Sequence, residues 1–229
     1  MTLSLLISVP HAGLKVPPEV KGICTLTRQQ IVEDGDEGAA EIYSLRGEVA
    51  SFVTTDIARA VVDLNRAEDD RRADGVVKTQ TIWEVPVYSE PLSDELVEML
   101  LTKYYRPYHD QLSVLAKNAK LGVDCHTMAA SGPPIASDAG QERPLICLSN
   151  AEGTCSESCL TRLAECLENS FRASVSINSP FKGGHIIRSH AHELPWVQLE
   201  LSRAPFLSIA QKRSCVLKAL TDWCISSGV

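Results

Sequence analysis

The stretch LGVDCHT, residues 121–127, is the part of the chain from which its fold and chemistry can be inferred first. It begins as an apolar run and contains Asp124 and His126, which can bind a metal or move a proton. A long helical pattern precedes it and a loop rich in glycine and proline follows it, which is typical of a buried parallel strand. In open α/β sheets the carboxyl ends of such strands line the crevice that holds ligands. The alternative is that Asp124 caps a turn and His126 is a hydrogen-bonded core residue.

Patterns typical of strands and helices alternate along the rest of the chain. Residues 3–9 and 196–201 are predicted to be strands, and in the second Gln198 and Glu200 share a face because side chains alternate. A long helix is predicted to begin after the N-cap residue Ser93 and to bend or divide at Pro107. Further helices are expected within 27–32, 36–49, 156–171 and 208–224, and short β-prone runs at 51–55, 60–64, 145–148, 174–177 and after the glycine pair 183–184. We therefore expect residues 1–229 to form a single three-layer α/β domain.

The composition argues against several classes of partner. The formal net charge of −7 gives no long-range attraction to nucleic acid or to membrane phosphates. No apolar run approaches the roughly 20 residues that a membrane-spanning helix needs. The eight cysteines are interpreted as reduced thiols, because the first residues lack the features of a signal peptide. These observations predict a soluble, cytoplasmic protein.

Polar side chains follow or end several of the predicted strands. His11 comes just after the first strand, Asn65 and Arg66 follow the run 60–64, and Glu200 lies in the last strand. Together with Asp124 and His126, these residues are expected to meet at one edge of the sheet. Two histidines, one carboxylate and an open water position form the usual set of a hydrolytic zinc site, with a further carboxylate free to act as base. The alternative is that each histidine has only a structural role.

Five short motifs span most of the chain: SVPHAG (8–13), VDLNR (62–66), VDCHTM (123–128), FKGGHIIR (181–188) and QLEL (198–201). Their sequences and their order resemble those of the N-formylglutamate amidohydrolase family. The resemblance implies a fold similar to the zinc carboxypeptidases and aspartoacylases, with a mixed, mostly parallel twisted sheet between helices. It also implies that a zinc-activated water hydrolyses the amide bond of an N-formyl or N-acyl amino acid.

The same resemblance implies a set of metal ligands. His11 and His126 match the two histidine ligands of the family, which would bind one divalent metal, zinc. The third ligand is expected in the segment DEGA, residues 36–39, which resembles the family's Asp-x-Gly-Ala version of the acidic segment. We assign Asp36 to this role and keep Glu37 as the alternative.

The remaining site residues are assigned from the matching motifs. Glu200 matches the general base, and Arg59 resembles the arginine that polarises the scissile carbonyl. Asn65 and Arg66 match the pair that holds a substrate carboxylate, and an arginine suits this task because its planar fork donates two parallel hydrogen bonds. Lys182 and Arg188, from the fourth motif, are also expected to bind substrate. The alternatives are that Arg66 pairs with Asp69 and that Lys182 and Arg188 lie on the surface.

The sequence departs from the family pattern at two positions, and these departures bear on which substrate can be predicted. Ala12 stands where the family commonly has serine, and Gly38 stands where the formylglutamate enzymes have histidine. We therefore predict an N-acyl amino acid with a free carboxylate as the substrate class. The competing hypotheses are an inactive carboxylate-binding protein of the same fold, a zinc carboxypeptidase-like peptidase, and an enzyme with Cys125 as nucleophile. The last is disfavoured because adjacent residues of a strand, such as Cys125 and His126, point to opposite faces.

Overall fold

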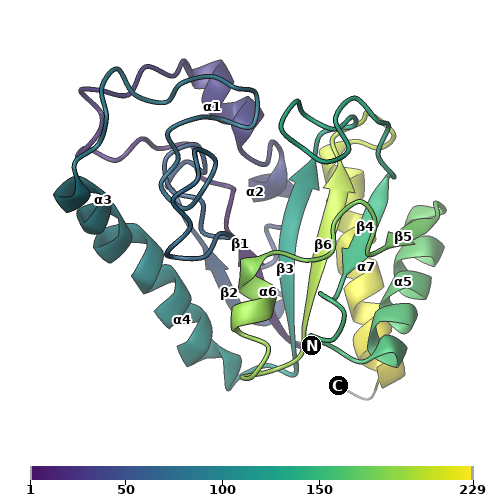
Figure 1. The fold of residues 1–229 in the computed structure, drawn as a ribbon. Helices are drawn as coiled ribbons and strands as arrows, with labels where there is room; N and C mark the ends of the chain where they lie inside the picture. The colour runs from purple at the N-terminus through teal and green to yellow at the C-terminus, as the bar shows by residue number, and fades with distance from the viewer. Residues whose placement is uncertain (1, 228–229) are drawn as a thin grey trace.

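A six-stranded sheet lies at the centre of the computed structural model, which describes residues 2–227 (Figure 1). The strand order is β2-β1-β3-β6-β4-β5. All neighbouring strands are parallel except β4 and β6, which are antiparallel. The predicted mixed, mostly parallel sheet is therefore confirmed. The strands are β1 (Leu3–Val9), β2 (Val49–Thr54), β3 (Leu121–Met128), β4 (Ile146–Ser149), β5 (Val175–Ile177) and β6 (Trp196–Ser202).

Helices cover both faces of the sheet (Figure 1). One core cluster joins alternate residues of β1 to the amphipathic helix α5 (Glu157–Phe171), to α7 (Ile209–Ser227) and to the short α2 (Ala39–Ile42). A second cluster joins Leu6 of β1 to α1 (Arg28–Asp34), to α3 (Asp94–Leu100) and α4 (Arg106–Ala116), and to α6 (His185–Ser189). This arrangement gives the three layers that the sequence predicts. Within residues 2–227, no helix is long and apolar enough to cross a bilayer.

Local sequence signals explain several elements. The Ser93 and Ser156 side chains accept hydrogen bonds from backbone N–H groups in the first turns of α3 and α5, as N-caps do. A π-helical turn, Leu101–Tyr105, separates α3 from α4, whose second residue is Pro107. Proline lacks a backbone N–H and its ring clashes with the carbonyl four residues back, so a wider turn relieves the conflict. The predicted division of the long helix is confirmed.

Three local predictions are wrong. The helix expected over 36–49 is limited to Ala39–Ile42. It ends before Tyr43, because the hydroxyl of Tyr43 donates to the distant His126 carbonyl at 2.8 Å. Asp36 therefore lies before the helix instead of in its first turn. The buried run 60–64 forms turns with one isolated bridge, Val62 to Val77. The residues after the glycine pair form α6, whose Ile186 N–H donates to Asn65 Oδ1 at 2.8 Å.

A fully buried ion pair anchors the long excursion between Leu64 and Ser93. Lys78 Nζ lies 2.9 Å from both carboxylate oxygens of Asp34, the last residue of α1, and both side chains are 0% exposed. Asp34 Oδ1 also accepts a hydrogen bond from Ile82 N at 2.7 Å. The Asp34–Lys78 pair therefore fixes a segment whose Ile82 side chain lines the cleft described next.

Candidate active site

A cleft of about 310 Å³ opens at the carboxyl edge of the central strands. Because β1, β3 and β6 are parallel neighbours, the residues at their ends are brought together. His11 lies two residues past β1, and His126 and Glu200 are direct partners across β3 and β6. All three line the cleft and are at least 94% buried. The strand-end residues predicted from the sequence do meet at one edge of the sheet.

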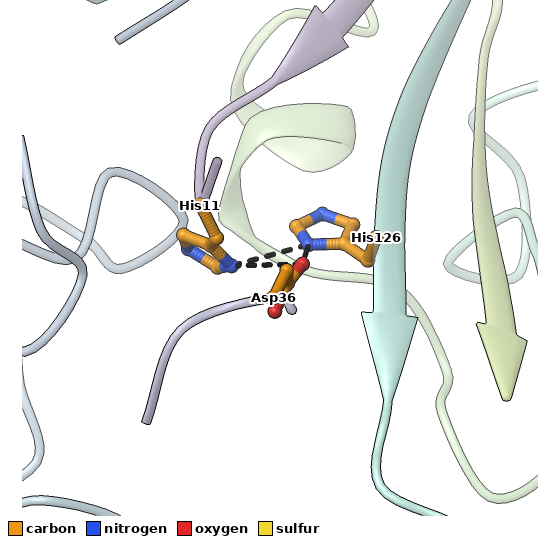
Figure 2. A group of neighbouring side chains, drawn as sticks. All are labelled: His11, Asp36 and His126. Carbon is orange, nitrogen blue, oxygen red and sulfur yellow. Dashed lines mark hydrogen bonds and ion pairs between the residues drawn. The ribbon is translucent and has the colours of Figure 1, made fainter. Parts of the chain in front are cut away.

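Two histidines and one aspartate converge in this cleft (Figure 2). Asp36 Oδ2 lies 3.0 Å from His126 Nδ1 and 3.5 Å from His11 Nδ1, and the two Nδ1 atoms are 3.2 Å apart. One ligand atom from each of the three residues lies within 4.8 Å of the others. Glu37, the alternative ligand, is exposed and is not part of this group. The geometry favours Asp36.

The second ring nitrogen, Nε2, of both His11 and His126 faces a buried aspartate. His11 Nε2 lies 2.8 Å from Asp63 Oδ1, and His126 Nε2 lies 2.8 Å from Asp124 Oδ2. Metal-binding histidines usually donate their second ring N–H to such a carboxylate, which fixes the tautomer and leaves the other nitrogen free to bind the metal. Both Nδ1 atoms are directed toward Asp36, as that arrangement requires.

The charges around this group fit a divalent cation. Four buried carboxylates, those of Asp36, Asp63, Asp124 and Glu200, surround the two imidazoles. Burial would lower the pKa of His126, but Asp124 and Asp36 raise it well above its usual value. Burial would likewise raise the pKa of Asp36, but His11 and His126 lower it well below its usual value. Two imidazoles and a carboxylate are a donor set that zinc commonly uses in hydrolytic sites.

Glu200 has a raised pKa and a defined hydrogen-bond partner. Burial is the main cause that raises its pKa from 4.5 to about 6. Gln198 Oε1 accepts from Gly184 N at 2.6 Å, so the amide nitrogen of Gln198 is the atom that donates to Glu200 Oε1, at 2.9 Å. Arg203, the basic residue nearest to Glu200 in the sequence, forms no salt bridge with it. Arg203 Nη2 instead lies 3.7 Å from Asp36 Oδ1 and donates to the Gly35 carbonyl.

Arg59, assigned to the scissile carbonyl, and Arg66, assigned to the substrate carboxylate, both line the cleft and both have acidic partners. Arg59 Nε donates to Asp63 Oδ2 at 2.9 Å, and Nη1 donates to the Asp34 carbonyl. Burial would lower the pKa of Arg59, but the Asp63 carboxylate raises it above its usual value. Arg66 Nη2 donates to Asp74 Oδ2 at 2.9 Å and its Nε lies 3.8 Å from Asp63. Arg66 is therefore paired with Asp74 instead of Asp69.

Asn65 lines the cleft, but its amide is already engaged. Its Nδ2 donates to Asp124 Oδ2 at 3.2 Å, and its Oδ1 accepts from the N–H of Ile186 at 2.8 Å. A Cβ atom added at Gly184 would lie 2.3 Å from this amide, so the second glycine of the pair is needed for the close approach. In this structure Asn65 holds Asp124 and the start of α6.

The remaining assigned residues lie in different places. Lys182 lines the cleft rim, where it is exposed and lies 3.7 Å from Glu152. Arg188 is exposed on α6 and is not among the residues that line the cleft. Cys125 is fully buried in the core cluster on the other face of β3, where burial raises the pKa of its thiol well above its usual value. Its position excludes a direct attack by this thiol in the cleft.

Among the site residues that were not assigned a role from the sequence are Asp63, Asp124 as a partner of His126, and Arg203. Asp63 and Asp124 did carry a signal, because a charged residue inside an apolar run is costly unless it is paired. Arg203 follows β6 directly, which placed it near the strand ends. Their partners are distant in sequence, so spacing alone could not identify them.

Comparison with known proteins gives consistent results. Residues 3–207 match the family model described as N-formylglutamate amidohydrolase. An N-formylglutamate deformylase of Pseudomonas putida is 30% identical, with 99% of this chain and 94% of the relative covered. One of Pseudomonas aeruginosa is 28% identical, with 89% and 82% covered. The crystal structure of an N-formylglutamate amidohydrolase from Ralstonia eutropha JMP134 is similar in fold, with a TM-score of 0.81, 18% identity, and 100% and 96% of the two chains covered.

Proposed function

The chain belongs to the N-formylglutamate amidohydrolase family, and we propose that it hydrolyses the amide bond of N-formylglutamate or a closely related N-acyl amino acid. The observation that carries this proposal is the buried group of His11, Asp36 and His126 beside Glu200 in one cleft. The relatives named as deformylases support the same reaction. Residues 1–229 would act as one catalytic domain, and the eight free thiols favour a cytoplasmic protein.

We propose that one divalent metal, zinc, is held by His11 Nδ1, His126 Nδ1 and Asp36 Oδ2. When bound there, such a cation supplies a water of lowered pKa and polarises the substrate carbonyl. Asp63 and Asp124 keep the two imidazoles in the tautomer that leaves Nδ1 unprotonated. Arg203 lies near the other oxygen of Asp36, which favours binding through Oδ2 alone.

Glu200 is proposed as the general base. It removes a proton from the attacking water and returns one to the leaving amine, so the C–N bond breaks and a carboxylic acid and an amino acid are released. Burial raises the pKa of Glu200 toward the range that suits a general base, and the Gln198 amide holds one carboxylate oxygen in place. Arg59 is proposed to donate to the oxyanion that forms on the carbonyl.

The substrate carboxylate is proposed to bind at Arg66, with Asn65, Lys182 and Arg188 assisting. Arg66 is 30% exposed and lines the cleft, so it can exchange its contact with Asp74 for a carboxylate of the substrate. Lys182 at the rim adds positive charge. Asn65 would assist through its position beside Asp124, and Arg188 through the cleft-lining Gly183, to whose carbonyl its Nε donates.

A hydrolysis screen tests this proposal. Zinc-loaded protein is assayed with N-formyl-L-glutamate, N-acetyl-L-glutamate and N-formyl derivatives of uncharged amino acids, and the released amine is measured. We expect turnover of the N-formyl acids, loss of turnover on chelation, and recovery with added zinc. His126→Ala protein serves as the metal-site control. Absence of amine release from every N-formyl and N-acyl amino acid would favour the inactive carboxylate-binding protein instead.

A further inference from the structure

Four histidines outside the cleft gather in a second groove. The chain has six histidines, and His11 and His126 belong to the site already described. The other four, His109, His185, His190 and His192, all line one groove of about 700 Å³. His109 lies on α4, and the others lie on α6 or just after it, so both elements line the groove.

Two of these histidines face each other through ring nitrogens. His109 Nδ1 lies 2.9 Å from His190 Nε2, and the rings are nearly parallel, with an interplanar angle of 10°. Each outer nitrogen has a close partner that can only accept, and the nearby Ser113 hydroxyl, 3.5 Å from His190 Nδ1, donates its hydrogen to Glu193 Oε1 at 2.6 Å. His109 Nε2 lies 3.0 Å from the Leu64 carbonyl, and His190 Nδ1 lies 3.0 Å from Glu193 Oε2.

These contacts determine where the protons lie. A carbonyl and a carboxylate accept hydrogen bonds, so the outer nitrogen of each ring carries a hydrogen. If both rings are neutral, the two inner nitrogens then carry only lone pairs, which repel each other at 2.9 Å. A positive species at this point, either an additional proton or a metal cation, removes this repulsion. Burial, with His190 and His185 nearby, lowers the pKa of His109 to about 4, so the lone pair of His109 Nδ1 is available.

We propose that His109 Nδ1 and His190 Nε2 form a second binding site for a divalent transition metal of the zinc class. Imidazole is a preferred ligand of zinc, copper and nickel. Two nitrogens that bind one tetrahedral zinc are about 3.3 Å apart and direct their lone pairs at the ion, so the pair, 2.9 Å apart in this structure, must open slightly and both rings must turn. His109 Nε2 and His190 Nδ1 make hydrogen bonds to the Leu64 carbonyl and the Glu193 carboxylate, which are the kinds of partner that orient metal-binding histidines.

The surroundings of the pair accept added positive charge. Glu193 is held between Ser113 Oγ, at 2.6 Å, and His190. Glu68 and Asp69 also line the groove. Of the two arginines that line it, Arg106 is paired with Glu68 and Glu98, at 2.7 and 2.6 Å. Because the groove is open, water can complete the coordination of a cation bound by the two nitrogens.

Metal titration of designed variants tests this site. His109→Gln keeps an amide N–H that can reach the Leu64 carbonyl but removes the inner nitrogen. His190→Asn keeps an N–H for Glu193 and removes the other inner nitrogen. His192→Gln is the matched control, because His192 lines the same groove but is 76% exposed and lies 3.7 Å from Glu193. Chelator-treated protein is titrated with zinc by calorimetry, and cobalt absorption spectra give an independent count of sites.

The expected result is a difference in stoichiometry. The parent and His192→Gln should bind the same number of zinc ions, and each pair variant should bind about one fewer. This difference does not depend on whether the first site binds metal. Circular dichroism verifies the fold of each variant, and either folded pair variant decides the question. Equal zinc stoichiometry in the parent and a folded pair variant would overturn the proposal and leave a proton as the species between the rings.

Discussion

Replacing Glu200 with glutamine removes one charge from the cleft and keeps the shape of the side chain. The amide oxygen of glutamine can still accept from Gln198 Nε2, so the 2.9 Å hydrogen bond is retained. The new side chain cannot take a proton from water. If Glu200 is the base, turnover should fall by roughly 100- to 10,000-fold, the range for a lost acid–base group. This corresponds to about 2.7–5.4 kcal/mol of activation free energy.

The same substitution should not destabilise the fold. Burial raises the pKa of Glu200 from 4.5 to about 6, so its ionised form disfavours folding. This penalty is absent below the unfolded-state pKa and is fully present above the folded-state pKa. A shift of this size corresponds to about 2 kcal/mol. At pH 8, metal-free Glu200→Gln protein should therefore unfold with a free energy about 2 kcal/mol higher than the parent.

Three measurements on one variant test this reasoning: turnover, metal content and denaturant unfolding with and without chelator. We expect slow turnover, an unchanged metal content and a higher unfolding free energy in the metal-free state. A variant that unfolds more easily and turns over normally per folded molecule would show that Glu200 has a structural role.

Three further predictions concern the metal, the substrate and pH. Elemental analysis of dialysed protein should show that His11→Ala and His126→Ala each bind about one metal fewer per chain than the parent and lose activity; full activity of metal-free protein would contradict this. Arg66→Lys keeps the charge but loses the bidentate fork, so kcat/KM for free-acid substrates should fall about 10- to 100-fold while amidated analogues change little; an equal effect on both would exclude a carboxylate contact. Glu200 must be ionised to act as base, and a bound cation lowers its pKa below the metal-free value of about 6. We therefore expect kcat/KM to fall as the pH decreases, with the midpoint of the fall at or below about pH 6. A midpoint above about pH 7 would contradict this.

Elements fixed by local signals could be predicted from the sequence. The apolar runs of β1, β3 and β6, the N-caps Ser93 and Ser156, and the break before Pro107 each depend on nearby residues. The meeting of His11, His126 and Glu200 also followed, because parallel neighbouring strands end at the same edge of a sheet. That inference needed only the order of strands and helices.

Features that depend on distant partners could not be predicted. The helix after Asp36 stops early because Tyr43 binds the backbone of His126, which is 83 residues away. The run after the glycine pair is β-prone but becomes α6, since Asn65 accepts a backbone hydrogen bond from its first turn. The pairing of Asp63 with His11 likewise depends on the folded chain. Each of these contacts lies within or beside the candidate site.

The buried pair of Asp34 and Lys78 restricts how this sequence can diverge. Losing either partner leaves an uncompensated charge in the interior, which typically destabilises a protein by about 3–5 kcal/mol, whereas an apolar pair of similar volume is often tolerated. Single substitutions at these positions should therefore be eliminated by selection, and only coupled changes should persist. In related sequences we expect positions 34 and 78 to vary together, with opposite charges or with two apolar residues.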